Sequence, residues 1–241
     1  MLDRFGPDGG DVLRLYSDAV NDSLLQRWLP ARSDRLLKTD LFDEAVADGL
    51  YPLLRERAEE VVGIDVSEDV IAAARARYPD LRGERADVRR LPFADGAFDV
   101  VVSISTLDHL SSLSEIEAAV GELHRVLRPG GSLIVTLDNL LNPLVALRNA
   151  LPQAPLRRIG LVPYELGTTC GPRRLRRVLT TRGFAVEELV ALMHVPRVLV
   201  RLLAPVLPTR TRAPLLAAER LGRLPTRMLT GQFVAVRACK S

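Results

Sequence analysis

Short apolar runs alternate with helical patterns between residues 34 and 138, and this alternation constrains the fold more than any other feature of the sequence. The runs at 61–65 and 98–105 read VVGID and FDVVVSIS, and they are nearly continuous in apolar residues instead of alternating apolar with polar ones. Such runs are typical of parallel strands that helices cover on both faces. The sequence therefore predicts an α/β fold with a parallel sheet.

Strands and helices are expected in alternation along this part of the chain. The expected strands are Arg35–Lys38, Glu60–Asp65, Leu81–Ala86, Phe98–Ser105 and Ser132–Leu137. The expected helices are Leu13–Trp28, ahead of the sheet, and then Phe42–Arg57, Glu68–Tyr78 and Ser114–Leu127. Further along, a strand over Phe184–Ala191 follows a short helix, and the alternating segment 231–238 is expected to pair with it at the sheet edge.

The two parts of the chain carry opposite charge. Residues 1–140 hold 16 basic and 26 acidic side chains, whereas residues 141–241 hold 17 and 4. The basic residues are dispersed, aromatic residues make up only 5% of the chain and no known nucleic-acid-binding motif occurs, so we expect no nucleic-acid partner. Cys170, Cys239 and three separated histidines form no metal-ligand spacing, so we expect no metal.

Composition also bears on location. Two cysteines cannot build a disulfide framework, and the first residues are acidic and glycine-rich where a secretory signal needs a basic and then an apolar segment. The most apolar stretch, 189–207, is a poor membrane span because arginines and prolines interrupt it. We therefore expect a cytoplasmic protein, and contact of the segment 194–229 with a membrane surface stays open.

Three segments, in this order, resemble the class I S-adenosylmethionine-dependent methyltransferases: VVGIDVS at 61–67, ADVRRLPFADGAFDVVVS at 86–103 and ELHRVLRPGGSLIVT at 122–136. The resemblance covers about residues 34–138. It implies a Rossmann-like sheet of seven strands, parallel except for the last strand, with helices on both faces. It also implies an N-terminal helical cap at 1–33 and a methyltransferase-like domain at 34–241, with acceptor-covering segments near 140–170 and 194–229.

S-adenosylmethionine is the cofactor that the resemblance implies, bound at the carboxyl ends of the strands. Asp65 corresponds to the acid that accepts both ribose hydroxyls, and Asp87 to the residue that accepts a hydrogen bond from the adenine amine. The alternatives are a helix cap for Asp65, although Ser67 already fills that position, and an ordinary turn for Asp87. The expected cofactor-binding residues are Lys38, Thr39, Asp40, Asp65, Val66, Asp87, Val88 and Ser105.

The chain departs from the family in the loop after the first strand, where a typical member is glycine-rich. Residues 37–44 read LKTDLFDE, and no glycine follows until Gly49. The acidic side chains of this loop would repel a pyrophosphate, which disfavours dinucleotide cofactors, whereas S-adenosylmethionine carries a net positive charge. Two roles are open for Lys38: it binds the carboxylate of the cofactor, or Asp43 or Glu44 neutralises it.

Methyl transfer from a sulfonium depends on positioning more than on a base. His109 follows the fourth strand at the ligand edge and is a candidate base, with Asp108 orienting it. The alternative is that Asp108 caps the next helix and His109 packs on it. Tyr16 and Trp28 are candidates for a cofactor lid, with ordinary packing as the alternative, and His194 is a weak candidate for the acceptor pocket.

The resemblance implies methyl transfer, and the apolar segment after the fifth strand predicts a small, largely apolar acceptor, such as a lipid, a glycosylated metabolite or another secondary metabolite. The expected lining is Pro143, Leu144, Leu147, Leu151, Val198, Leu199, Leu202 and Leu203. Two alternatives stay open: an enzyme that uses the altered loop for a cyclisation or elimination, and a non-catalytic binding protein of the same fold. Arg197 and Arg201 share a helical face that either binds anions or is simply solvated.

Overall fold

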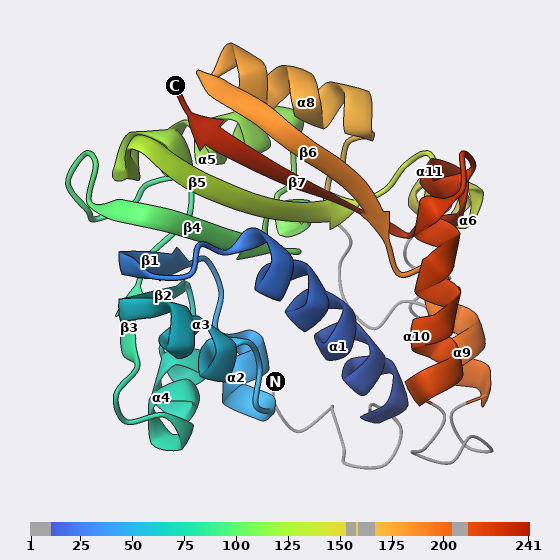
Figure 1. Ribbon diagram of the computed structural model, residues 1–241, viewed down its shortest axis with the longest axis horizontal. Helices are drawn as coiled ribbons and strands as arrows, with labels where there is room; N and C mark the ends of the chain where they lie inside the picture. Colours follow the sequence, from blue (N-terminus) through green and yellow to red (C-terminus); the bar gives the residue numbers. More distant parts are fainter. Residues whose placement is uncertain (1–10, 153–157, 159–166, 204–211) are drawn as a thin grey trace.

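A computed structural model describes residues 11–152, 158, 167–203 and 212–241. Seven strands form one sheet in the order β3-β2-β1-β4-β5-β7-β6 (Figure 1). The strands are β1 (Ser33–Lys38), β2 (Ala58–Asp65), β3 (Arg82–Arg85), β4 (Phe98–Ile104), β5 (Leu127–Asp138), β6 (Phe184–Leu192) and β7 (Phe233–Lys240). The first five are parallel and β7 is antiparallel to both of its neighbours. The predicted fold class is therefore confirmed.

The described helices cover both faces of this sheet. They are α1 (Asp11–Trp28), α2 (Phe42–Val46), α3 (Tyr51–Arg57), α4 (Glu68–Arg77), α5 (Leu113–Val126), α6 (Pro143–Ala150), α8 (Pro172–Thr181), α9 (Arg197–Leu203), α10 (Arg212–Ala218) and α11 (Arg227–Thr230), with short 3-10 turns η2 (Leu107–His109) and η4 (Glu219–Arg223). No described helix is long and apolar enough to span a bilayer.

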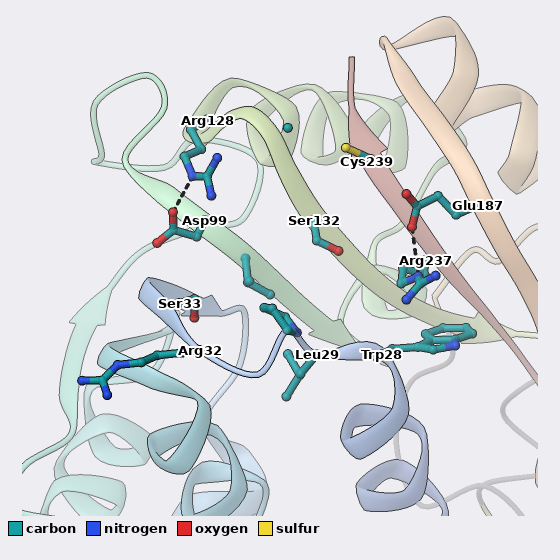
Figure 2. A pocket seen from close by; sticks show the side chains of 13 residues that line it. Trp28, Leu29, Arg32, Ser33, Asp99, Arg128, Ser132, Glu187, Arg237 and Cys239 are labelled. Atoms are coloured by element: carbon teal, nitrogen blue, oxygen red, sulfur yellow. Dashed lines mark hydrogen bonds and ion pairs between the residues drawn. The ribbon is translucent and has the colours of Figure 1, made fainter.

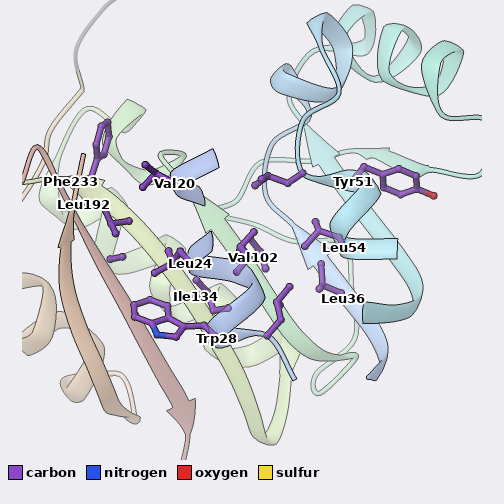
Figure 3. Packing of buried hydrophobic residues seen from close by; sticks show 14 of the residues in the cluster. Val20, Leu24, Trp28, Leu36, Tyr51, Leu54, Val102, Ile134, Leu192 and Phe233 are labelled. Atoms are coloured by element: carbon purple, nitrogen blue, oxygen red, sulfur yellow. The ribbon is translucent and has the colours of Figure 1, made fainter. Parts of the chain in front are cut away.

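Successive residues of the central strands enter two different apolar clusters. Leu36, Val102 and Ile134 pack with α1, α3 and α4, as Figure 3 shows for part of this cluster. Their chain neighbours Leu37 and Val101 pack with α5 and α8 on the opposite face. Because side chains of a strand point alternately to the two faces of a sheet, both faces need apolar residues. This explains the continuous apolar runs of the sequence.

The position of β7 differs from the prediction in one respect. The segment 231–238 was expected at the sheet edge, and it does pair with β6, but β7 also pairs with β5 and lies between the two. Residues Phe233–Val236 are buried, whereas most of β6 is only half-buried. The edge strand is therefore β6, and the more buried β7 occupies the inner position.

The predicted helix over 42–57 is wrong, because the structure has two helices there. Gly49 adopts a left-handed backbone (φ +60°) between α2 and α3, a conformation that other residues rarely take. The buried carboxylate of Glu44 accepts hydrogen bonds from the backbone N–H groups of Leu50 and Tyr51, at 2.8 and 3.2 Å. Since the first N–H groups of a helix have no partner within it, Glu44 stabilises the start of α3.

Leu41 anchors the loop after β1 in the core. Its side chain is fully buried and lies against Gly63 of β2. A Cβ atom at Gly63 would overlap the Cδ2 atom of Leu41. The loop itself has no glycine, but Gly63 on the neighbouring strand β2 leaves the space that the Leu41 side chain fills.

Replacing Gly63 by alanine is expected to destabilise the protein by about 1–3 kcal/mol, because the added methyl group overpacks a buried site. Adding Leu41→Ala should cost less than the sum of the two single changes, since the smaller side chain makes room. Chemical denaturation measures all three variants. Gly171→Ala is the control, because a Cβ atom there meets nothing within 4 Å. Equal stabilities of the Gly63 and Gly171 variants would contradict the role of Leu41.

Candidate functional site

Lys38, the last residue of β1, is only 2% exposed. Its Nζ atom donates a hydrogen bond to the carbonyl oxygen of Asp40 at 2.6 Å and lies 2.8 Å from Glu44 Oε2 and 3.4 Å from Asp40 Oδ1. Burial lowers the pKa of Lys38, but the carboxylates of Asp40, Glu44 and Asp43 outweigh burial and hold this pKa above its ordinary value. Of the two predicted roles, the geometry favours neutralisation within the loop, because the three N–H donors of Lys38 have partners there.

Hydroxyl groups join the ends of β1 and β4. Thr39 Oγ1 donates to Ser103 Oγ at 3.0 Å and lies 2.7 Å from Thr106 Oγ1. Thr106 Oγ1 in turn lies 3.2 Å from Asp40 Oδ2, to which it donates. Thr39 and Asp40, which were predicted to contact the cofactor, therefore belong to a network of hydrogen bonds. This network fixes the loop after β1, which we call the rebuilt loop (residues 37–44), against β4.

Asp65 ends β2 at the same edge of the sheet. Its Oδ2 accepts from the backbone N–H of Leu41 at 3.2 Å, and its Oδ1 accepts from the N–H of Ser67 at 2.9 Å. Each carboxylate oxygen can accept a second hydrogen bond, so the group can still bind two hydroxyls. Val66, the next residue, is 64% exposed, which leaves an apolar surface beside this carboxylate.

Asp87 is bound more tightly than Asp65. Its carboxylate accepts from the backbone N–H of Arg89 at 2.8 Å and pairs with the Arg89 guanidinium at 2.6 Å, and Glu115 also pairs with that guanidinium. Hydrogen bonds from the Arg89 side chain hold the pKa of Asp87 below its ordinary value. Val88 beside it is buried. An adenine amine at Asp87 would therefore have to share this carboxylate with Arg89.

Ser105 follows β4 in a left-handed conformation (φ 51°), which is uncommon for a residue with a side chain. Its N–H donates to Thr136 Oγ1 of β5 at 2.9 Å. Strained backbone of this kind is concentrated at functional sites, where the surrounding structure holds it in place. Ser105 thereby turns the chain sharply at the carboxyl ends of β4 and β5.

Asp108 lies in the short turn η2 after β4, and its Oδ1 is buried without a hydrogen-bond partner among the described residues. Burial and the nearby charge of Asp138 raise the pKa of Asp108 to about 8. Asp138 ends β5 and forms an ion pair with Arg148 of α6. Asp108 is thus protonated near neutral pH and faces a second carboxylate, while His109 beside it is exposed.

Asp138 and Arg148 did not emerge from the sequence analysis. Asp138 ends a buried strand, as Asp65 does, and this position alone could have identified it. Arg148 is the sixth residue of a helix whose start Asn142 and Pro143 mark, but its approach to Asp138 depends on tertiary packing. Thr169 Oγ1 donates a hydrogen bond to the carbonyl oxygen of Asp138 at 2.8 Å, which joins the segment before α8 to the end of β5.

Three aromatic residues that were candidates for the site are buried and hydrogen-bonded within the protein. Tyr16 and Trp28 of α1 are buried and donate to Glu219 and Glu188, respectively. His194 is also buried, with Nδ1 2.7 Å from Thr230 Oγ1 and Nε2 3.3 Å from the carbonyl oxygen of Ala191. The structure thus favours ordinary packing for all three, the alternative stated for Tyr16 and Trp28.

A cavity of about 310 Å³ lies at the other end of the sheet (Figure 2). Ser33 and Asp99, at the amino ends of β1 and β4, contribute to its wall. The ion pairs Asp99–Arg128 and Glu187–Arg237 satisfy the charged groups around it. This cavity is therefore separate from the polar residues at the carboxyl edge.

Comparison with known proteins finds similarity to methyltransferases. Residues 45–135 match the family described as Methyltransferase domain, so the match begins directly after the rebuilt loop. A protein of Mycolicibacterium smegmatis named as a probable S-adenosylmethionine-dependent methyltransferase is 32% identical over 142 residues, which is 59% of this chain and 50% of that protein. A demethylmenaquinone methyltransferase of Beutenbergia cavernae is 41% identical over 134 residues, 52% of this chain and 54% of that protein.

The chain spans about half the length of these curated relatives. A crystal structure of a methyltransferase from Thermotoga maritima, described as a possible histamine N-methyltransferase, superposes with a TM-score of 0.64 at 17% identity. That superposition covers 96% of this chain and 93% of the other. At this identity the likeness concerns the fold.

Lys38→Met is expected to destabilise the protein by about 3–5 kcal/mol, because Glu44 would then be a buried charge without its partner. The double variant Lys38→Met with Glu44→Gln should recover part of this loss, since the glutamine carbonyl can still accept from the start of α3. Arg32→Met, which breaks an exposed pair with Glu59, is the control and should cost under about 1 kcal/mol. Equal losses for the Lys38 and Arg32 variants in urea denaturation would rule out a buried pair.

Asp108→Asn tests the raised pKa. Because folding raises this pKa from about 4 to about 8, the folded state binds more protons across that window, and stability falls as pH rises through it. The asparagine variant lacks this titration, so its melting temperature should fall less and exceed that of the wild type by a few degrees at the alkaline end. Asp95→Asn, at an exposed site, should behave as the wild type does. Identical pH profiles of the Asp108 variant and the wild type would contradict the assignment.

Proposed function

We propose that this chain belongs to the S-adenosylmethionine-dependent methyltransferases, and that it transfers a methyl group from S-adenosylmethionine to a small, largely apolar acceptor. The observation that carries the proposal is the half-buried carboxylate of Asp65 beside the exposed Val66, at the edge where sheets of this kind bind ligands. When bound, S-adenosylmethionine would supply an activated methyl group on a sulfonium.

The residues at the edge of the sheet fit such a cofactor at its nucleoside end. Asp65 would accept hydrogen bonds from the ribose hydroxyls with its free lone pairs, and Val66 would contact the adenine ring. The side chains of Leu41 and Glu44, in the loop after β1, point into the core, Leu41 against Gly63 of β2 and Glu44 beside Lys38.

For the methionine end of the cofactor, the loop after β1 provides carboxylates, because its lysine is already paired. Lys38 pairs with Asp40 and Glu44, and Asp43 lies 3.7 Å from Arg14, while the carboxylates of Asp40 and Asp43 are half-buried at the surface of the loop. Negative charge at this place suits a ligand with a sulfonium and an ammonium group. We infer that the loop holds the cofactor through these charges and through backbone groups.

We propose Asp108 and His109 as the residues nearest the reacting atoms. Both follow β4 at the carboxyl edge, next to the left-handed turn at Ser105. His109 is exposed and can accept a proton from a hydroxyl acceptor. Asp108, protonated near neutral pH, can donate a hydrogen bond to the acceptor, and Asp138 stabilises that protonated form.

An apolar acceptor is supported by two observations. One relative is named for the acceptor demethylmenaquinone. The segment that follows β5 in this chain is rich in leucine, and several of its leucines are exposed near the edge of the sheet. Metal ligands play no part in the proposal, and the described residues hold no group of three that could bind a metal ion.

Calorimetric titration with S-adenosylhomocysteine tests the cofactor site. The wild type is expected to bind in the micromolar range, and Asp65→Ala should weaken binding by about tenfold or more, because a hydrogen bond to a charged group is lost. Asp95→Ala, an exposed acid at the other end of β4, is the matched control and should leave affinity unchanged. Absence of binding to the folded wild type would overturn the proposed function.

Transfer itself is tested with a labelled methyl group. The chain is incubated with S-adenosylmethionine labelled in the methyl group and a total lipid extract, and the label is then partitioned between water and organic solvent. Label in the organic phase is expected, reduced strongly in His109→Ala. If the cofactor binds and no label reaches the organic phase, the apolar acceptor is wrong while the family assignment stands.

A further inference from the structure

Helix α6 exposes leucine side chains to solvent along one face. The exposed residues are spaced by three or four positions, as neighbours on a helix surface are: Leu141, Leu144, Leu147 and Leu151. Leu147 is 58% exposed and Leu144 49%. Val145, which follows Leu144, is buried, and Arg148 beside the leucines pairs with Asp138, so these two residues attach the helix to the rest of the molecule. Rows of exposed leucines are uncommon on a soluble surface and indicate a contact site.

The start of α6 is fixed to α11, so the two helices form one surface. Asn139 Nδ2 donates to the carbonyl oxygens of Met228 and Gly231, and Asn142 Nδ2 donates to that of Thr230, all at 2.8 Å. Figure 1 shows α6 and α11 together at the same corner of the molecule. Leu229 of α11 is 54% exposed there. We call these four leucines of the α6 segment together with Leu229 the leucine face.

Exposed arginines lie on α11 and on the adjoining turn η4. Arg220 and Arg223 of η4 and Arg227 of α11 are exposed, and none of them forms an ion pair with a residue that the structure describes. Within the segment 194–229 the sequence has seven arginines and one acid, Glu219. That acid is used internally, because it accepts from Tyr16 and from the backbone N–H groups of Met193 and His194. We call Arg220, Arg223 and Arg227 the arginine rim.

We propose that the leucine face and the arginine rim bind the surface of a bilayer that contains anionic phospholipids. The leucines enter the boundary between headgroups and acyl chains, and the arginines bind lipid phosphates, whose oxygens match a guanidinium in geometry and charge. The proposal does not depend on methyl transfer. It places the carboxyl edge of β5, with Asp138, next to the membrane.

The charge of this corner favours a membrane over a second copy of the chain. In a symmetric dimer through the leucine face, the arginine rim would need acidic partners on the same corner of the other copy. The described residues supply no unpaired acid at this corner. An anionic bilayer provides both the apolar layer and the opposite charge.

Sedimentation of the full chain with vesicles tests the proposal. Wild-type protein is expected to pellet with vesicles of phosphatidylcholine and phosphatidylglycerol, and less with phosphatidylcholine alone. The paired change Leu144→Ser with Leu147→Ser, and separately Arg223→Glu with Arg227→Glu, should each lower the partition coefficient by about tenfold or more. Melting temperature and S-adenosylhomocysteine binding, measured on the same preparations, show that each variant is folded.

Two matched controls make the test specific to this surface. Arg176→Glu with Arg177→Glu changes net charge equally on the exposed face of α8, and Leu15→Ser removes an exposed leucine of α1. Both should sediment as the wild type does. Failure of the wild type to bind anionic vesicles overturns the proposal, and so does an equal loss in the α8 control. A wild-type dimer in light scattering that Leu144→Ser and Leu147→Ser dissociate would show that the face joins two copies instead.

Discussion

The ammonium group of Lys38 lies inside the protein, and the carboxylate of Glu44 at 2.8 Å balances it. Neither charge would be stable there alone, because transfer of an unpaired ion out of water costs several kcal/mol. The pair joins the end of β1 to α2, and Glu44 also binds the first N–H groups of α3. Through Asp40 it continues into the hydroxyl groups at the end of β4. In this chain, side-chain bonds give the loop after β1 the order that a glycine-rich loop obtains from its backbone.

The sheet was predictable from the sequence because strands buried on both faces leave long apolar runs, as in VVGID and FDVVVSIS. The position of Asp65 at the carboxyl end of β2 was predictable for the same reason, since it ends such a run. The partners of Lys38 were only partly predictable: Glu44 was one of the two expected acids. Two features were not predictable. Gly49 divides the expected helix into two, and the charge of Asp138, at the end of β5, acts on Asp108, which follows β4. Both depend on tertiary packing, which the periodicity of the sequence does not encode.

The carboxyl edge of the sheet combines two kinds of carboxylate. Asp65 is held by backbone N–H groups and keeps accepting capacity, whereas burial and the charge of Asp138 raise the pKa of Asp108 to about 8. The two environments therefore give the carboxyl groups different chemistry: Asp65 can accept hydrogen bonds, and Asp108 in its protonated form can donate one. The match to the methyltransferase family begins at residue 45 and so includes both carboxylates, while the rebuilt loop stays outside it.

The insertion of β7 between β5 and β6 has a consequence for synthesis of the chain. Within the described sheet β6 has β7 as its neighbour, and β5 needs β7 to complete its hydrogen bonds on that side. Since β7 is the last of these strands to leave the ribosome, nascent β5 keeps an unpaired, strongly apolar border until then. An unpaired strand edge can form hydrogen bonds with a strand of another chain. A pause in translation shortly before residue 233 would therefore favour aggregation and increase the dependence of folding on chaperones.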